Sequence, residues 1–161
     1  MILDERLEFA DNVACNASAG TALIGAGIDL EVARDVGGGQ PVYLCIRTGG
    51  TEIITGGSAG TVQFKLASDA AAAVATDGSA TEHVVTDTFV TDGTDANAAQ
   101  LKVGGTIYFG AIPSQGFVYE RYLGILCVTA TTTTTAGTIN AFLTFDPSTA
   151  SAYKDLPDAT N

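Results

Sequence analysis

The clearest indication of the fold is the segment Gly60-Thr61-Val62-Gln63-Phe64-Lys65-Leu66. Within it, the apolar Val62, Phe64 and Leu66 alternate with the polar Gln63 and Lys65. Successive side chains of a β-strand point to opposite faces, so this period of two places the apolar side chains together. The glycine before the run is typical of the turn that precedes a strand. We therefore expect a half-buried strand with a core on one side and water on the other.

The same period of two recurs along the chain, whereas a period near 3.6 is almost absent. The clearer further strands are predicted at residues 42–47, 106–109, 121–129 and 138–145, and the weaker ones at 13–17, 22–30 and 83–90. Residues 121–129 form a longer apolar run, which suits a central strand covered on both faces. Short helical pieces are expected only at 3–9 and 69–74. The pattern predicts an all-β fold, a single-domain jelly roll or two-sheet β-sandwich of about eight strands with short helical turns.

The chain has 161 residues, which suits one domain. We expect residues 1–147 to form the sandwich, with 1–9 as a docking arm, and the polar residues 148–161 to form a tail. Loops are expected at 49–60, 70–81 and 91–100, which are rich in small and polar residues. The five consecutive threonines, 131–135, either extend the preceding strand into a sheet edge or form an exposed turn.

Charge narrows the classes of partner. Seven basic residues against eighteen acidic ones give a formal charge of −11. This field repels phosphate, so we expect neither nucleic-acid binding nor binding to an anionic membrane. The acidic start does not resemble a signal peptide, and no apolar run approaches the length of a membrane span. The charge suits solubility or docking on a basic protein surface, and we weigh these two roles equally.

Residue chemistry offers little for catalysis. The single histidine, His83, lies in a Thr- and Val-rich strand and is expected to be structural or merely exposed. Cys15, Cys45 and Cys127 lack metal-ligand spacing and are expected to be buried, reduced thiols. No serine lies in a GxSxG elbow, and no phosphate-binding glycine motif is present. We therefore expect no catalytic residues, no metal, no cofactor and no enzymatic activity.

The best ligand candidate is the acidic, Thr-rich stretch around Asp87, Asp92 and Asp95. Clustered carboxylates are able to hold calcium. However, Asp92-Gly93-Thr94-Asp95 does not follow the order of an EF-hand loop, and Asp-Gly is a common turn. A plain turn is the favoured interpretation, and ion binding is left open.

The order of several short motifs carries a family resemblance. The quoted segments are Met1-Ile2-Leu3-Asp4, Phe9-Ala10-Asp11, Ile28-Asp29-Leu30, Ala33-Arg34-Asp35-Val36-Gly37, Gly39-Gln40-Pro41-Val42-Tyr43-Leu44, Glu120-Arg121-Tyr122-Leu123, Ala136-Gly137-Thr138-Ile139 and Ala141-Phe142-Leu143. In this order they resemble the jelly-roll cement proteins of tailed phages, whose type member decorates the head of a Bordetella phage. The middle of the chain, residues 49–100, matches only in general character.

This resemblance implies a structural virion protein, made in the bacterial host cytoplasm and bound to the outer capsid surface. There it would tie neighbouring major capsid proteins together, as a dimer or trimer on the capsid symmetry axes. The candidate partner-binding residues are Ile2, Leu3, Arg6, Leu7, Phe9, Arg34 and Asp35. For residues 1–9, packing of the terminus on its own sandwich is weighed equally with docking on the capsid. For Arg34 and Asp35, the equal alternative is an internal salt bridge.

Two other functions compete with this one. A carbohydrate- or receptor-binding jelly roll of a phage would need exposed aromatic side chains, and Tyr108, Phe117, Tyr119 and Tyr122 form the nearest set in the sequence. A small enzyme on a β-sandwich would need a polar constellation, which the sequence does not contain.

Overall fold

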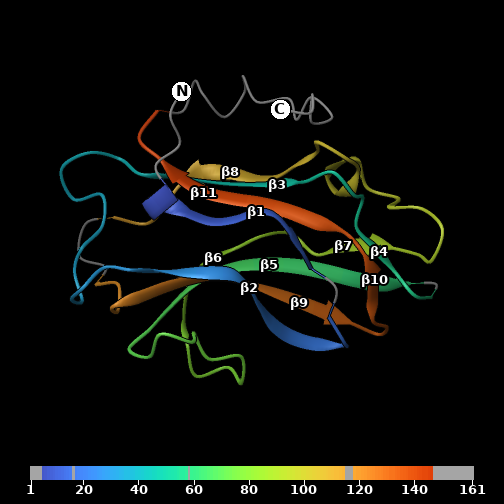
Figure 1. The fold of residues 1–161 in the computed structure, drawn as a ribbon, viewed down its shortest axis with the longest axis horizontal. Coiled ribbons are helices and arrows are strands. Elements are labelled where there is room, and N and C mark those ends of the chain that lie inside the picture. Colours follow the sequence, from blue (N-terminus) through green and yellow to red (C-terminus); the bar gives the residue numbers. More distant parts are fainter. Residues whose placement is uncertain (1–4, 16, 58, 115–117, 147–161) are drawn as a thin grey trace.

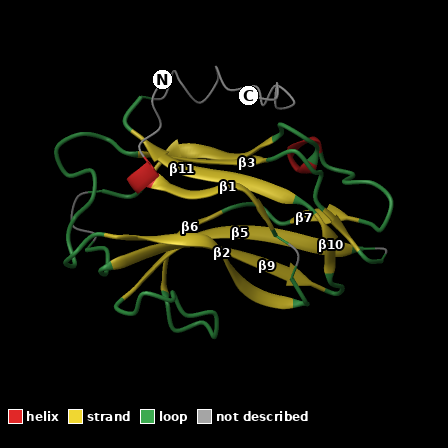
Figure 2. Cartoon of the chain, viewed as in Figure 1, coloured by secondary structure: helices red, strands yellow, loops and turns green. Residues whose placement is uncertain are grey.

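Two antiparallel sheets face each other in the computed structural model, which describes residues 5–15, 17–57, 59–114 and 118–146 (Figures 1 and 2). The elements are η1 (Glu5–Leu7), β1 (Glu8–Ala14), β2 (Gly20–Asp29), β3 (Tyr43–Thr48), β4 (Ile54–Thr55), β5 (Gly60–Asp69), β6 (Thr81–Val85), β7 (Phe89–Thr91), η2 (Ala99–Leu101), β8 (Thr106–Ala111), β9 (Tyr122–Ala130), β10 (Thr134–Ala136) and β11 (Thr138–Thr144), where η marks a 3-10 turn. The predicted all-β sandwich is confirmed. None of the described helices is long and apolar enough to span a membrane.

Strand order identifies the sandwich as a jelly roll. The first sheet has the order β1-β11-β3-β8, and the second has the order β2-β9-β5-β6, with β7 also paired to β5. The chain crosses from one layer to the other six times: between β1 and β2, β2 and β3, β3 and β5, β7 and β8, β8 and β9, and β9 and β11. Early and late strands therefore interleave in both sheets. A two-stranded sheet of β10 and β4 lies at one end (Figure 1).

Strand β5, which the alternation in residues 60–66 predicts, lies in the middle of the second sheet. In β5 the side chains of Val62, Phe64 and Leu66 are all 0% exposed in the core between the sheets. On the opposite face of β5, the Lys65 ammonium forms a 2.6 Å ion pair with Glu82 of β6. The predicted alternation is therefore confirmed residue by residue.

The neighbouring strand β9 is covered on both faces, as its long apolar run predicts. Leu123 and Ile125 point into the main core, whereas Leu126 belongs to a second apolar cluster on the outer face. That second cluster is closed by Val74 and Ala80 from the 70–80 loop, which crosses the outer side of the second sheet in Figure 1.

The helix predicted at residues 69–74 is wrong. β5 continues through Asp69, and the chain then bends instead of coiling. The Asp69 carboxylate accepts hydrogen bonds from the backbone N–H groups of Ala71 and Ala75, both at 2.9 Å. A side chain that binds nearby N–H groups offers the backbone an alternative to a helix, and here it outweighs the alanine propensity. At the amino terminus, only Glu5–Leu7 of the predicted piece forms a 3-10 turn, and residues 3 and 4 lie outside the described ranges.

The threonine run follows neither alternative completely. After β9 the backbone turns at Thr131, whose φ is +74°, and the chain re-enters extended structure as β10, which pairs with β4. Thr134 is buried, with its hydroxyl 2.8 Å from that of Thr129. The predicted strand at 83–90 is also divided, into β6 and β7. Between them, Thr86 donates its N–H to the carbonyl of Phe64 at 2.9 Å, and its hydroxyl accepts from the N–H of Phe64 at 3.0 Å.

Candidate functional site

Part of the predicted docking arm, residues 1–9, belongs to the sandwich itself. Ile2 and Leu3 lie outside those residues, and Arg6 is exposed in η1. Leu7 packs against the core, and Phe9 is only 2% exposed within β1. Phe9 is therefore a core residue of the sandwich and is not available to an exposed arm, which corrects its assignment as a contact residue.

Arg34 and Asp35 lie in the connection between β2 and β3, and both are exposed. The backbone of Arg34 forms an isolated antiparallel bridge with Tyr119, with N–O distances of 3.0 Å in both directions. Among the described residues, the ion pairs do not include one between Arg34 and Asp35. The backbone bridge holds this connection in place and leaves both side chains at the surface.

Tyr119 anchors the other side of this bridge. Its side chain is fully buried, and its hydroxyl donates a 2.6 Å hydrogen bond to the carbonyl of Pro113. Burial, with a smaller contribution from the negative charge of Asp35, raises the pKa of Tyr119 to about 12. The ring lies against the imidazole of His83, with centroids 4.1 Å apart. Tyr119 is thus a structural residue.

Ser68 and His83 form the one serine–histidine contact between described residues. The Ser68 hydroxyl lies 2.7 Å from Nε2 of His83 and accepts a 3.2 Å hydrogen bond from the N–H of Glu120. Burial lowers the pKa of His83 below its usual value. Ser68 is 0% exposed, so its oxygen is not accessible to a substrate. The contact joins β5, β6 and the segment just before β9, and it makes His83 a structural residue.

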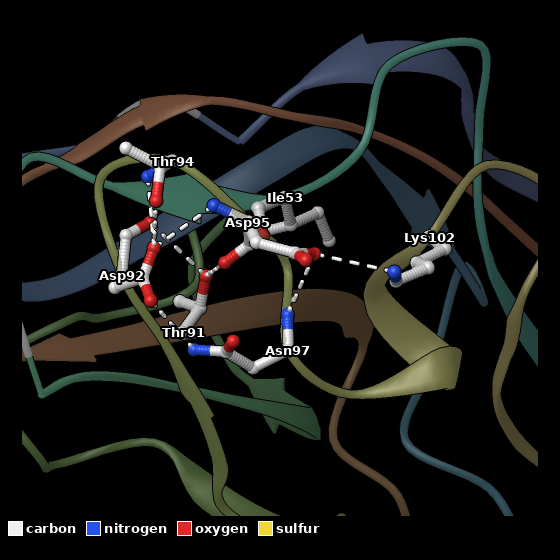
Figure 3. Close-up of polar contacts among 7 residues, drawn as sticks. All are labelled: Ile53, Thr91, Asp92, Thr94, Asp95, Asn97 and Lys102. Carbon is white, nitrogen blue, oxygen red and sulfur yellow. Dashed lines mark hydrogen bonds and ion pairs between the residues drawn. The ribbon is translucent and has the colours of Figure 1, made fainter.

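The acidic loop after β7 is organised by Asp92 (Figure 3). One carboxylate oxygen of Asp92 accepts hydrogen bonds from the N–H of Thr94 at 2.8 Å, the hydroxyl of Thr94 at 2.8 Å and the N–H of Asp95 at 2.9 Å. The other oxygen accepts from the side-chain amide of Asn97 at 3.1 Å. These donors, led by the two backbone N–H groups, hold the pKa of Asp92 far below its usual range.

The other two acidic residues of this stretch do not complete a metal site. Asp95 forms a 3.2 Å ion pair with Lys102, and Asp87 is exposed on the segment between β6 and β7. Across the described ranges, no three His, Cys, Asp or Glu side chains are grouped to hold a metal ion. Because Asp92 uses both oxygens to fix its own loop, the geometry fits the favoured interpretation of a turn.

The aromatic set expected of a carbohydrate platform is dispersed. Tyr119 is buried, Tyr108 is half-buried against the core, and Phe117 lies outside the described residues. Tyr122 lies under the Arg121 guanidinium, whose carbon is 4.8 Å from the ring centroid. An exposed platform built from these four residues is therefore not present in the described part of the chain.

Arg121 pairs with Asp29 of β2. Its guanidinium donates two hydrogen bonds to the carboxylate, at 2.9 and 2.8 Å, and this bidentate contact lowers the pKa of Asp29 to about 2. The pair ties the end of β2 to the start of β9 at the surface, and its role is structural.

One pair of stacked aromatic side chains on the surface of the first sheet was not predicted from the sequence. Tyr43 of β3 and Phe109 of β8 stack on the outer face of the first sheet, with centroids 5.8 Å apart and rings inclined by 15°. Phe109 is 39% exposed. The signal in the sequence is the neighbouring pair Tyr108-Phe109, because adjacent residues of a strand cannot both point into the core.

The three cysteines are all free and buried, as predicted. Burial is the largest cause that raises the pKa of Cys15 to about 12 and those of Cys45 and Cys127 to about 11. Thiols in this state behave as small apolar side chains, so they add no nucleophile to the surface.

Comparison with known proteins gives one family. The sequence pattern of the Bbp16 family matches residues 9–143, which run from β1 to β11. No curated protein matches the chain. Since the match spans nearly the whole described sandwich, the chain belongs to the Bbp16 family of phage proteins.

Proposed function

We propose that this protein is a capsid cement protein, which binds the outer surface of a phage head and ties neighbouring major capsid proteins together. The observation that carries the proposal is membership of a phage protein family over residues 9–143. It agrees with the resemblance to jelly-roll cement proteins in the ordered motifs of the sequence. The protein would then act in the virion, on the outside of the capsid, after synthesis in the bacterial cytoplasm.

The polar chemistry of the described surface supports a binding role over an enzymatic one. Asp92 uses its carboxylate to fold a loop, Asp29 is paired with Arg121, and the Ser68–His83 contact is buried. These groups stabilise loops and strand ends, and they leave the exterior of the sandwich as the working part. We therefore propose a non-enzymatic protein without a cofactor, metal, nucleic acid or membrane as its partner.

Electrostatics supports a basic docking partner. A formal charge of −11 on 161 residues attracts a positively charged protein surface and accelerates encounter with it. Presentation of many copies on a capsid lattice adds multivalency, because each contact raises the local concentration for the next. Binding to heads is therefore expected to weaken as the salt concentration rises.

One end of the sandwich is the proposed contact region. Figure 1 shows η1 and the β2–β3 connection at the same end of the long axis. These two segments carry the exposed candidates Arg6, Arg34 and Asp35. Residues 1–4, which include the candidates Ile2 and Leu3, precede η1 directly.

The test is co-sedimentation of the purified full chain with heads of the encoding phage that lack this protein. We expect saturable, salt-sensitive binding to the heads. Asp35→Asn should weaken binding about tenfold, whereas Asp87→Asn, the same charge change on another exposed loop, should leave it unchanged. Deletion of residues 1–4, which spares η1 and β1, tests the arm separately. Failure of the wild-type chain to bind heads, together with clear hits on a glycan array, would replace this proposal with the receptor-binding alternative.

A further inference from the structure

Strand β8 has an open side. It ends the sheet order β1-β11-β3-β8, so β3 is its single neighbouring strand among the described residues. The N–H of Ile112 donates to the carbonyl of Val42 at 2.9 Å, and Gly110 is in register with Leu44. In an antiparallel ladder, alternate residues face the neighbour. Tyr108 and Gly110 thus face β3, and the N–H and C=O groups of Phe109 and Ala111 point to the open side.

The other sheet edges carry features that block pairing with another chain. β1 contains Glu8 and Asp11 and has two register shifts against β11. β2 has a shift between Ile24 and Ile28. At the remaining edge, β6 carries charge, and β7 is only three residues long. Charges, bulges and short strands are the usual protection of an edge.

Strand β8 has less of that protection: its one register shift against β3 lies between Tyr108 and Thr106, and residues Tyr108 to Ala111 pair in regular register. Its sequence, Thr106–Ala111, contains no charged residue and no proline. Phe109 is 39% exposed beside Tyr43, and Ala111 is exposed as well. A regularly paired, uncharged stretch of edge strand with an exposed aromatic ring is a template for another strand.

The net charge of the chain indicates which partner pairs with the open edge of β8. Two copies that each carry −11 repel one another wherever acidic faces meet, so they approach most favourably through an uncharged surface. A basic partner protein does not need an uncharged surface, because it would bind more favourably to an acidic face of the sandwich. The absence of charge on β8 therefore favours a second copy of this chain over a basic partner.

We propose that β8 pairs antiparallel with β8 of a second copy, around a two-fold axis at Gly110. This register places Phe109 opposite Ala111 of the second copy, so that the open N–H and C=O groups of both residues bond across the axis. The large Phe109 ring meets a small methyl group, and Gly110 brings no side chain to the axis. The interface is isologous and produces a closed dimer, in which each first sheet continues into the other.

The test measures the mass of the full chain by sedimentation over a range of concentrations. The wild type should be a dimer. Ala111→Pro should raise the dimer dissociation constant at least about tenfold, because it removes an outward N–H without touching the β3 ladder. Phe109→Lys, which introduces a charge at the edge, should do the same. Val85→Lys, at a 49% exposed position on β6, is the matched control and should remain dimeric.

Amide hydrogen exchange provides the second readout. The amides of Phe109 and Ala111 should be protected in the wild-type dimer, and protection at Phe109 should be lost in the Ala111→Pro variant. A monomeric or trimeric wild type, or a dimer unaffected by both β8 variants, would overturn the proposal. A monomeric wild type whose Ala111→Pro variant no longer binds heads would assign the edge to the shell protein instead. A monomeric Ala111→Pro that still binds heads supports the β8 dimer and leaves the cement function intact.

Discussion

A β-carbon at Gly25 would lie 1.9 Å from the carbonyl oxygen of Phe9. Gly25 occupies the irregular part of β2, between Ile24 and Ile28, where the register against β9 shifts. Its φ of +68° is a left-handed conformation that favours glycine. The absence of a side chain here lets β2 of the second sheet approach the backbone of β1 in the first. This contact closes one side of the sandwich and explains why the two layers meet there.

Replacement of Gly25 tests this closure. Gly25→Ala should lower the free energy of unfolding by about 2–4 kcal/mol, because it combines left-handed strain with a clash against backbone. Gly39→Ala, at a glycine with no atom within 4 Å of the added carbon, should change it by less than about 0.5 kcal/mol. Urea unfolding monitored by circular dichroism measures both. Equal stability of the two variants would show that the sheets do not depend on this approach.

Protonation of His83 should destabilise the fold. Burial lowers the pKa of His83 from 6.5, so the unfolded chain binds the proton more readily than the folded chain. The stabilising contribution is therefore complete above pH 6.5 and declines as the pH falls from there toward the lowered pKa of the folded state.

The measurement for His83 is the free energy of unfolding between pH 8 and pH 5. The wild type should lose stability below about pH 6.5, and His83→Gln should lose less over the same interval, since carboxylates with lowered pKa values titrate at lower pH. Parallel pH profiles for the two proteins would mean that His83 does not couple folding to protonation.

The buried thiols should be unreactive in the native protein. Cys15, Cys45 and Cys127 are all 0% exposed, with raised pKa values. A disulfide reagent at pH 8 should therefore label them at least about 100-fold more slowly than in denaturant, where all three should react. Fast labelling of any one thiol in the folded protein would place that cysteine at the surface.

Calcium should not stabilise the protein through the Asp92 loop. Both oxygens of that carboxylate already accept hydrogen bonds from the loop. Millimolar calcium should leave the melting temperature unchanged in the wild type and in an Asp92→Asn variant. The Asn variant should itself expose the amides of Thr94 and Asp95 to faster hydrogen exchange. A calcium-dependent rise in melting temperature that Asp92→Asn abolishes would contradict the turn assignment.

Most of the main strands could be predicted from sequence because their side chains alternate strictly. β5 and β11 are examples: Phe64 and Leu143 point inward, as their spacing requires. A central strand such as β9 was also recognisable, since an apolar run without alternation is expected where both faces are covered.

The errors come from long-range contacts that a local pattern does not contain. The carboxylate of Asp69 converts an alanine-rich stretch into a loop, and Thr134 finds a buried partner in Thr129. Phe9 was assigned to an arm because the sequence around it does not indicate that β1 pairs with the distant strand β11. The site residues were the hardest to predict, since a surface that binds another protein needs no motif. The open edge of β8 became visible only once the strand order was known.

A cryo-EM map of mature particles of the encoding phage would test the proposed cement function most directly. We predict density for this jelly roll on the outside of the head, in contact with more than one major capsid protein subunit, with the η1 end turned toward the shell. Density for the sandwich in the tail or its fibres, or its absence from the particle, would contradict it.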